Sequence, residues 1–112
     1  MVALLTDTKA IERVLFGLAD PLRRHILDTL ASTGAGTATT LAAGLPVSRQ
    51  AVVKHLAILH RAGLVVGRRL GRERRYLVDP GRLDATARWM IGVAAEWDRR
   101  LRALTGEPSP PA

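Results

Sequence analysis

Residues 37–63 read TATTLAAGLPVSRQAVVKHLAILHRAG and contain two helical patterns separated by a short break. Thr37 or Thr39 is placed to cap a short first helix, which ends near Gly44. Ser48 is placed to cap a longer second helix that runs to the end of this segment. The apolar positions recur at helical spacing, with Leu41, Ala42 and Leu45 in the first helix and Val52, Leu56 and Leu59 in the second. A short helix, a tight turn and a longer helix make a helix-turn-helix.

The spacing of the apolar residues changes to a period of two directly after Gly63. Two β-rich runs, residues 64–70 and 74–78, flank the break Gly71-Arg72-Glu73. A break of about three residues that contains a glycine predicts a β-hairpin between such runs.

Two further helical patterns precede the helix-turn-helix. The first runs from Thr8 to Leu18, and residues 1–7, which carry no periodic pattern, are expected to form a flexible N-terminal arm. The second begins at Asp20-Pro21, because Asp can accept the free N–H groups of a first helical turn and Pro fits its first position. The connection at residues 32–36 is predicted to be flexible.

The last helical pattern spans Leu83 to Leu104. Its apolar residues recur at gaps of four and three: Leu83, Ala87, Met90, Ala94, Trp97, Leu101 and Leu104. This a/d spacing over three heptads favours a helix–helix contact, and the alternative is packing on its own domain alone. Residues 105–112 are expected to be a disordered tail. The fold class predicted for residues 8–104 is a single domain, mainly α with a small β-hairpin.

The positive charge is concentrated in one segment. The 112 residues carry a formal net charge of +7 and no cysteine. Residues 49–75 contain eight basic side chains and one acid, so this window holds the whole excess. A local basic face predicts a polyanionic partner such as double-stranded DNA. The lack of cysteine and of a signal-peptide pattern favours a cytoplasmic protein associated with the nucleoid, with no membrane contact.

The second helix of the helix-turn-helix carries side chains suited to reading bases. Gln50, Val53, Lys54 and Ala57 fall on the face opposite the apolar stripe, and Arg49 lies at its edge. Arg pairs with guanine, Gln with adenine, and Val contacts the thymine methyl group, so this face fits a DNA major groove.

Enzymatic and metal-binding patterns are lacking in the sequence. It contains no phosphate-binding glycine loop, HExxH or Gly-x-Ser-x-Gly motif, and we expect no catalytic residue and no cofactor. His55 and His60 lie five apart, which directs their side chains away from a shared ion, so no metal site is expected. His55 is expected at the edge of the core with one ring nitrogen bonded.

Several ordered motifs resemble one family of transcription regulators. They are LADPLRRHIL at residues 18–27, LPVSRQAVVKHL at 45–56, AGLV at 62–65 and GRERRY at 71–76. This set is similar to ArsR-type winged helix-turn-helix transcriptional regulators, over about residues 11 to 104. Because the sequence has no Cys, and no His in its last helix, it resembles the branch of that family that lacks metal-sensing motifs.

The resemblance implies a homodimer and a set of site residues. DNA would contact the recognition helix at residues 48–62 through Ser48, Arg49, Gln50, Val53 and Lys54, and the hairpin, or wing, at 64–78 through Arg72 and Arg74. The first and last helices would form the dimer through Ile11, Leu15, Met90, Ala94, Trp97 and Leu101. Val53 departs from the small polar residue expected there, so the base preference of relatives is not carried over.

We therefore expect a homodimeric, sequence-specific regulator, a repressor that binds a palindromic operator. One alternative is a nucleoid-type protein that coats DNA with little specificity. The other is an adaptor that binds a protein through helix 83–104. An inducer of unknown identity is left open. A pocket between the first and last helices, near Trp89, Met90 and Trp97, is one place for an apolar ligand, and packing in the core is an equal explanation for these residues.

Overall fold

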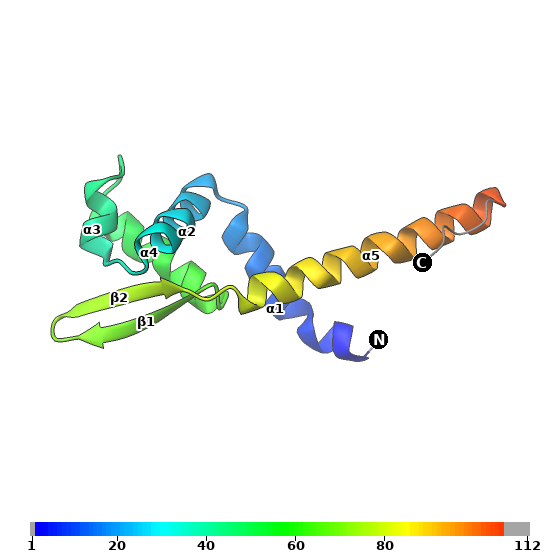
Figure 1. Ribbon diagram of the computed structural model, residues 1–112, viewed down its shortest axis with the longest axis horizontal. Coiled ribbons are helices and arrows are strands. Elements are labelled where there is room, and N and C mark those ends of the chain that lie inside the picture. Colours follow the sequence, from blue (N-terminus) through cyan, green and yellow to red (C-terminus); the bar gives the residue numbers. More distant parts are fainter. Residues whose placement is uncertain (1, 107–112) are drawn as a thin grey trace.

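The fold consists of five helices and one β-hairpin. A computed structural model describes residues 2–106, with side chains from Thr8 onward. The elements, in chain order, are α1 (Val2–Leu18), α2 (Pro21–Thr33), α3 (Ala38–Ala43), α4 (Arg49–Arg61), β1 (Val65–Leu70), β2 (Glu73–Val78) and α5 (Gly81–Thr105). The predicted class, mainly α with a small hairpin, is confirmed (Figure 1).

The two ends of the chain differ from the prediction. α1 begins at Val2, so the helix start predicted at Thr8 is wrong, and most of the predicted arm at residues 1–7 is helical. The reason is that residues 2–16 contain no Gly or Pro and are rich in strong helix formers, so nothing stops the helix at Thr8. α5 continues to Thr105 and ends at Gly106, whose φ is 76°. Residues 107–112 of the predicted tail lie outside the described residues.

Local caps fix the starts of α2, α3 and α4 as the sequence predicts, and Ser48 is the cap of α4. Asp20 accepts hydrogen bonds from the backbone N–H groups of Leu22 and Arg23, at 2.8 and 3.3 Å. Thr37, rather than Thr39, caps α3 in a reciprocal pair with Thr40. Each cap satisfies donors that the first helical turn leaves free.

The core lies between the helix-turn-helix and the elements around it. Val52, Leu56 and Leu59 of α4 are fully buried, as the apolar stripe predicted. Ile26 and Leu30 of α2 pack in the same cluster. The other members are Val14, Ala38, Leu41, Ala62, Leu64 and Val65. Because this core holds one face of α4, the opposite face is left outward.

The hairpin is antiparallel, and its register runs from Val65 opposite Val78 to Leu70 opposite Glu73. Its turn has two residues rather than about three, with Gly71 at a φ of 64° that a glycine adopts without strain. The connection predicted to be flexible is partly fixed, because Gly36 and Tyr76 of β2 exchange two backbone hydrogen bonds. The Gly36 N–H donates to the Tyr76 carbonyl and the Tyr76 N–H to the Gly36 carbonyl, with N···O distances of 3.1 and 2.8 Å. The sheet edge therefore holds the wing against the start of α3.

α5 extends away from the rest of the molecule. The molecule measures 61 × 28 × 21 Å, and α5 crosses α1 near its own start before it projects outward (Figure 1). The wing points in the opposite direction. No helix within residues 2–106 combines the length and apolar character needed to span a membrane.

Candidate nucleic-acid interface

The outward face of α4 carries the predicted base-reading residues. Gln50, Val53 and Lys54 are all exposed, and Val53, although apolar, keeps 41% of its surface exposed. No hydrogen bond or ion pair involves Gln50 or Lys54 among the described residues. The core stripe on the other side prevents α4 from turning, so these side chains are held outward and remain free for a ligand.

Two further predicted residues are tied into the helix-turn-helix itself. The Ser48 Oγ accepts a hydrogen bond from the backbone N–H of Ala51 at 3.1 Å and so caps α4. The Arg49 Nε donates to the Thr39 Oγ1 on α3 at 3.1 Å. This contact joins the two helices across their turn and directs the Arg49 side chain toward α3. Both residues remain exposed.

The wing brings arginines face to face. The register places Arg68 opposite Arg75 and Arg69 opposite Arg74. Arg72 lies in the turn, where it is exposed. Like charges directly opposite each other destabilise a sheet, and an anion between them would relieve the repulsion.

The exposed Arg74 side chain lies across the sheet beside Tyr76. A Cβ placed on Gly67 would lie 2.5 Å from the Arg74 Nε, so the side chain crosses the sheet where the glycine leaves room. Its guanidinium lies 5.8 Å from the centre of the Tyr76 ring. Arg74 and Tyr76 also line a cleft of about 340 Å³ with Ala57, His60 and Arg61 of α4. The arginine thus lies at the junction of the wing and the recognition helix.

This surface also includes four residues that were not predicted from the sequence: Gly67, Tyr76, His60 and Arg61. A glycine inside a strand pattern often marks a close approach, and Arg74 and Tyr76 share a strand face because they are two residues apart. Those two signals were present in the sequence. The contact of the wing with α4 depends on tertiary packing.

A buried arginine ties α4 to the end of α1. Arg23 is 6% exposed, and its guanidinium donates to the carbonyls of Phe16 and Gly17 at 2.7 and 3.0 Å. Its Nη1 also lies 3.4 Å from the His55 Nδ1. His55 therefore lies half-buried at the edge of the core with one ring nitrogen bonded, as predicted.

The Asp20 carboxylate completes this cluster, with its Oδ2 3.6 Å from the Arg23 Nη1. Desolvation raises the pKa of Asp20, but the hydrogen bonds from Leu22 and Arg23 and the Arg23 charge outweigh it. The net effect is a pKa below the usual value. The ionised carboxylate is thus the form that fits this place.

The residues predicted at a dimer interface lie on α1 and α5. Ile11 is half-buried and Leu15 is 39% exposed. The other four, on α5, are exposed: Met90, Ala94, Trp97 and Leu101. Trp97 and Leu101 expose 61% and 63% of their surface. The apolar seam of α5 is therefore not covered by the part of the chain that the structure describes.

The pocket expected between the first and last helices exists in part. A groove of about 290 Å³ lies there, lined by Ala10, Ile11, Val14, Arg82, Ala85, Thr86 and Trp89. Met90 and Trp97 are not among its lining residues, because they lie on the uncovered part of α5. Among the side chains from Thr8 to Gly106, no three His, Asp or Glu are grouped so that they could hold a metal ion.

Comparisons with known proteins agree on one family. A family model described as a helix-turn-helix domain matches residues 18–68. The HTH-type transcriptional regulator Rv2034 of Mycobacterium tuberculosis is 42% identical over 103 residues, which cover 91% of this chain and 89% of the relative. This relative shows that the chain is an HTH-type transcriptional regulator.

Two solved structures show the same arrangement. The ArsR-like transcriptional regulator from Rhodococcus sp. RHA1 has a TM-score of 0.80 and 40% identity, and the match covers 93% of this chain and 99% of that one. Rv0081 of M. tuberculosis has a TM-score of 0.59 and 26% identity, and the match covers 87% and 96% of the two chains. The chain belongs to the ArsR-type winged helix-turn-helix transcriptional regulators. This ArsR-type chain is thus a transcriptional regulator with a helix-turn-helix DNA-binding domain and is not an enzyme.

Proposed function

We propose that this ArsR-type regulator is a homodimeric repressor that binds a palindromic operator in the cytoplasm. The observation that carries the proposal is the outward face of α4, where Gln50, Val53 and Lys54 are exposed beside a wing of opposed arginines. An α-helix fits a DNA major groove, where Gln can bond adenine and Val can contact a thymine methyl group. The α4 face is therefore assigned to base reading, with Ser48 and Arg49 at its N-terminal end.

The wing is assigned to the phosphate backbone and the flanking groove. Arg72 lies exposed in the turn, and Arg74 lies beside the C-terminal end of α4, at the part of the wing that we call the wing root. The wing lies on the same side of the molecule as α4 (Figure 1). Contacts to phosphates supply affinity for any sequence, and that affinity falls as salt displaces the arginines.

The dimer is assigned to α1 and α5. Met90, Trp97 and Leu101 form an exposed apolar seam at heptad spacing, and Leu15 of α1 is also partly exposed. A contiguous apolar patch of this kind typically marks a protein–protein contact in a water-soluble domain. A two-fold axis through the seam would place two α4 helices on half-sites about 34–36 Å apart, or a multiple of that distance.

One other function has a specific observation in its favour. The opposed arginines of the wing would bind any duplex, so a nucleoid-type protein with little specificity is the second candidate. The two candidates differ in the ratio of the affinity for an operator to the affinity for random competitor DNA. The third candidate is an adaptor that binds a different protein through α5, and this function predicts no DNA binding at low salt.

Selection from a library of random duplexes separates these candidates. The purified chain is incubated with the library at about 0.15 M salt, since binding is salt-dependent. We expect an enriched palindrome, and sedimentation of the complex should show two chains per duplex. An unenriched library with strong binding would favour the nucleoid-type protein, and absence of binding at low salt would favour the adaptor.

A further inference from the structure

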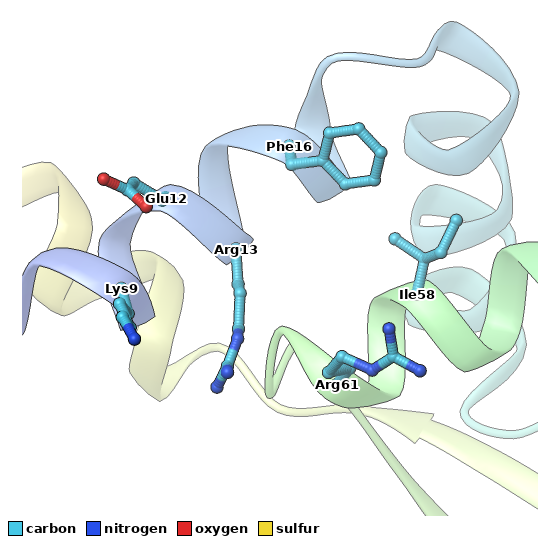
Figure 2. A pocket seen from close by; sticks show the side chains of 6 residues that line it. All are labelled: Lys9, Glu12, Arg13, Phe16, Ile58 and Arg61. Atoms are coloured by element: carbon cyan, nitrogen blue, oxygen red, sulfur yellow. The ribbon is translucent and has the colours of Figure 1, made fainter.

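A groove with unpaired positive charge lies between α1 and the C-terminal half of α4. It has a volume of about 440 Å³, within the range typical of small-molecule sites. Its lining residues are Lys9, Glu12, Arg13 and Phe16 from α1 and Ile58 and Arg61 from α4. Figure 2 shows the Phe16 ring and Ile58 together at one side of the groove, with the Arg61 side chain directed to that side beneath Ile58. The Arg13 side chain extends from α1 on the other side of the space between the helices.

Phe16 has no role in the core or in the proposed dimer. Its side chain is 60% exposed, although it is the only Phe of the chain. On α1 it shares a face with Lys9 and Arg13, whereas Ile11 and Leu15 lie on the opposite side. A dimer formed through Ile11 and Leu15 therefore leaves the groove open. The Phe16 ring is held in place by the Arg23 guanidinium, 4.9 Å from its centre.

The cations of the groove lack acidic partners. Among the side chains from Thr8 to Gly106, none of Lys9, Arg13 and Arg61 has an ion pair or hydrogen bond to the protein. Glu12 is the one acid among the lining residues, and its carboxylate points away from Ile58 and Arg61 (Figure 2). The groove thus combines an apolar wall with net positive charge. Such a surface is complementary to an anion that carries an apolar body.

We propose that this groove binds a small amphipathic carboxylate. Its apolar body, aromatic or aliphatic, lies between Phe16 and Ile58, and its carboxylate bonds to the guanidinium groups of Arg13 and Arg61. Guanidinium–carboxylate bonds are charge-assisted and directional, which makes the negative charge a requirement for binding.

Occupancy of the groove lowers DNA affinity, and this part rests on the proposed function. Arg61 is on the same face of α4 as Gln50 and Ala57, at the end nearest the wing root. A carboxylate bound there withdraws Arg61 from phosphates and adds negative charge beside them. Ligand and DNA then weaken each other by the same factor, about 5- to 150-fold for typical coupled sites.

Calorimetry of the full chain without DNA tests the binding site, with 2-naphthylacetate as the probe. The neutral alcohol 2-(2-naphthyl)ethanol has the same apolar body and serves as the control ligand. We expect the carboxylate to bind at least about tenfold more tightly than the alcohol. Phe16→Ala and Arg13→Gln should each weaken carboxylate binding about tenfold, while Arg24→Gln, an exposed arginine outside the groove, should leave it unchanged.

Equal binding of the two ligands, no binding of either, or unchanged binding in both groove variants would overturn the proposal. Circular dichroism of each variant shows whether it is folded. A second measurement, DNA affinity with and without 2-naphthylacetate, tests the coupling, which Arg13→Gln should abolish. A chain that binds the carboxylate but no DNA contradicts only the proposed function. A chain that binds DNA but not the carboxylate contradicts only the groove.

Discussion

The Arg74 side chain crosses β1 at Gly67, where an added Cβ would lie 2.5 Å from its Nε. The glycine therefore fixes where the guanidinium lies, beside Tyr76 and the C-terminal end of α4. A methyl group at this position would displace the flexible end of the arginine rather than the backbone. The position of one cation at the wing root thus depends on a residue that has no side chain.

Gly67→Ala should weaken binding to all duplexes, because it displaces Arg74 from its place beside α4. The slope of log affinity against log salt should become less steep by about 0.9, the value for one lost phosphate contact. The unfolding free energy should hardly change, since Ala suits a strand at least as well as Gly. Fluorescence anisotropy at several salt concentrations measures the slope.

The matched control for Gly67→Ala is a double-mutant cycle with Arg74→Ala. The two substitutions should not add, because both remove the same contact. Full additivity would show that Gly67 acts on DNA binding by some route other than Arg74.

Arg23→Met should destabilise the fold by about 1–3 kcal/mol. The variant keeps the apolar length of the side chain but removes the donors to the carbonyls of Phe16 and Gly17. Urea unfolding at a fixed protein concentration measures the change, since a dimer's stability depends on concentration. Arg24→Met, next to it but exposed, should cost less. An equal cost for both would contradict a specific role of Arg23.

Arg68→Glu should stabilise the wing while it weakens DNA binding. It places an acid opposite Arg75, where two arginines now face each other. Relief of this repulsion should raise the unfolding free energy by about 0.2–1 kcal/mol. Arg68→Gln, which removes the repulsion without adding an attraction, should give a smaller gain. A loss of stability in both variants would show that the opposed arginines do not repel.

Leu101→Arg should convert the proposed dimer to a monomer. The substitution places a charge in the apolar seam of α5, while the side chain is 63% exposed in the single chain, so the fold should be retained. Ala103→Arg on the opposite face of α5 is the control and should sediment as the wild type. A wild-type chain that sediments as a monomer at micromolar concentration would contradict the dimer itself.

Local chemistry made most of the elements predictable from the sequence. The caps at Asp20, Thr37 and Ser48 depend on bonds within three residues, so a short sequence pattern determines them. The apolar stripe of α4 identified its buried face and thereby its outward face. The start of α1 was missed because Thr8 resembles a cap, whereas the residues before it favour a helix without any periodic pattern.

Contacts between segments far apart in the chain could not be predicted from the sequence as well as the helices and strands. The bridge between Gly36 and Tyr76 joins residues forty apart, and no local pattern indicates it. The wing register depends on a turn of two residues rather than three, and a slip of one residue would move Arg74 to the other face of the sheet. The groove between Phe16 and Arg61 arises only where α1 crosses α4.

Base reading by α4 is tested most directly by a comparison of DNA affinities. The affinities of wild type and Gln50→Ala are measured on the selected operator, on its single-position variants and on a random duplex. We expect Gln50→Ala to lose about 1–3 kcal/mol on the operator and to become indifferent to the base at one position, with random-duplex affinity nearly unchanged. An equal loss of affinity for the operator and for the random duplex would contradict base reading by Gln50.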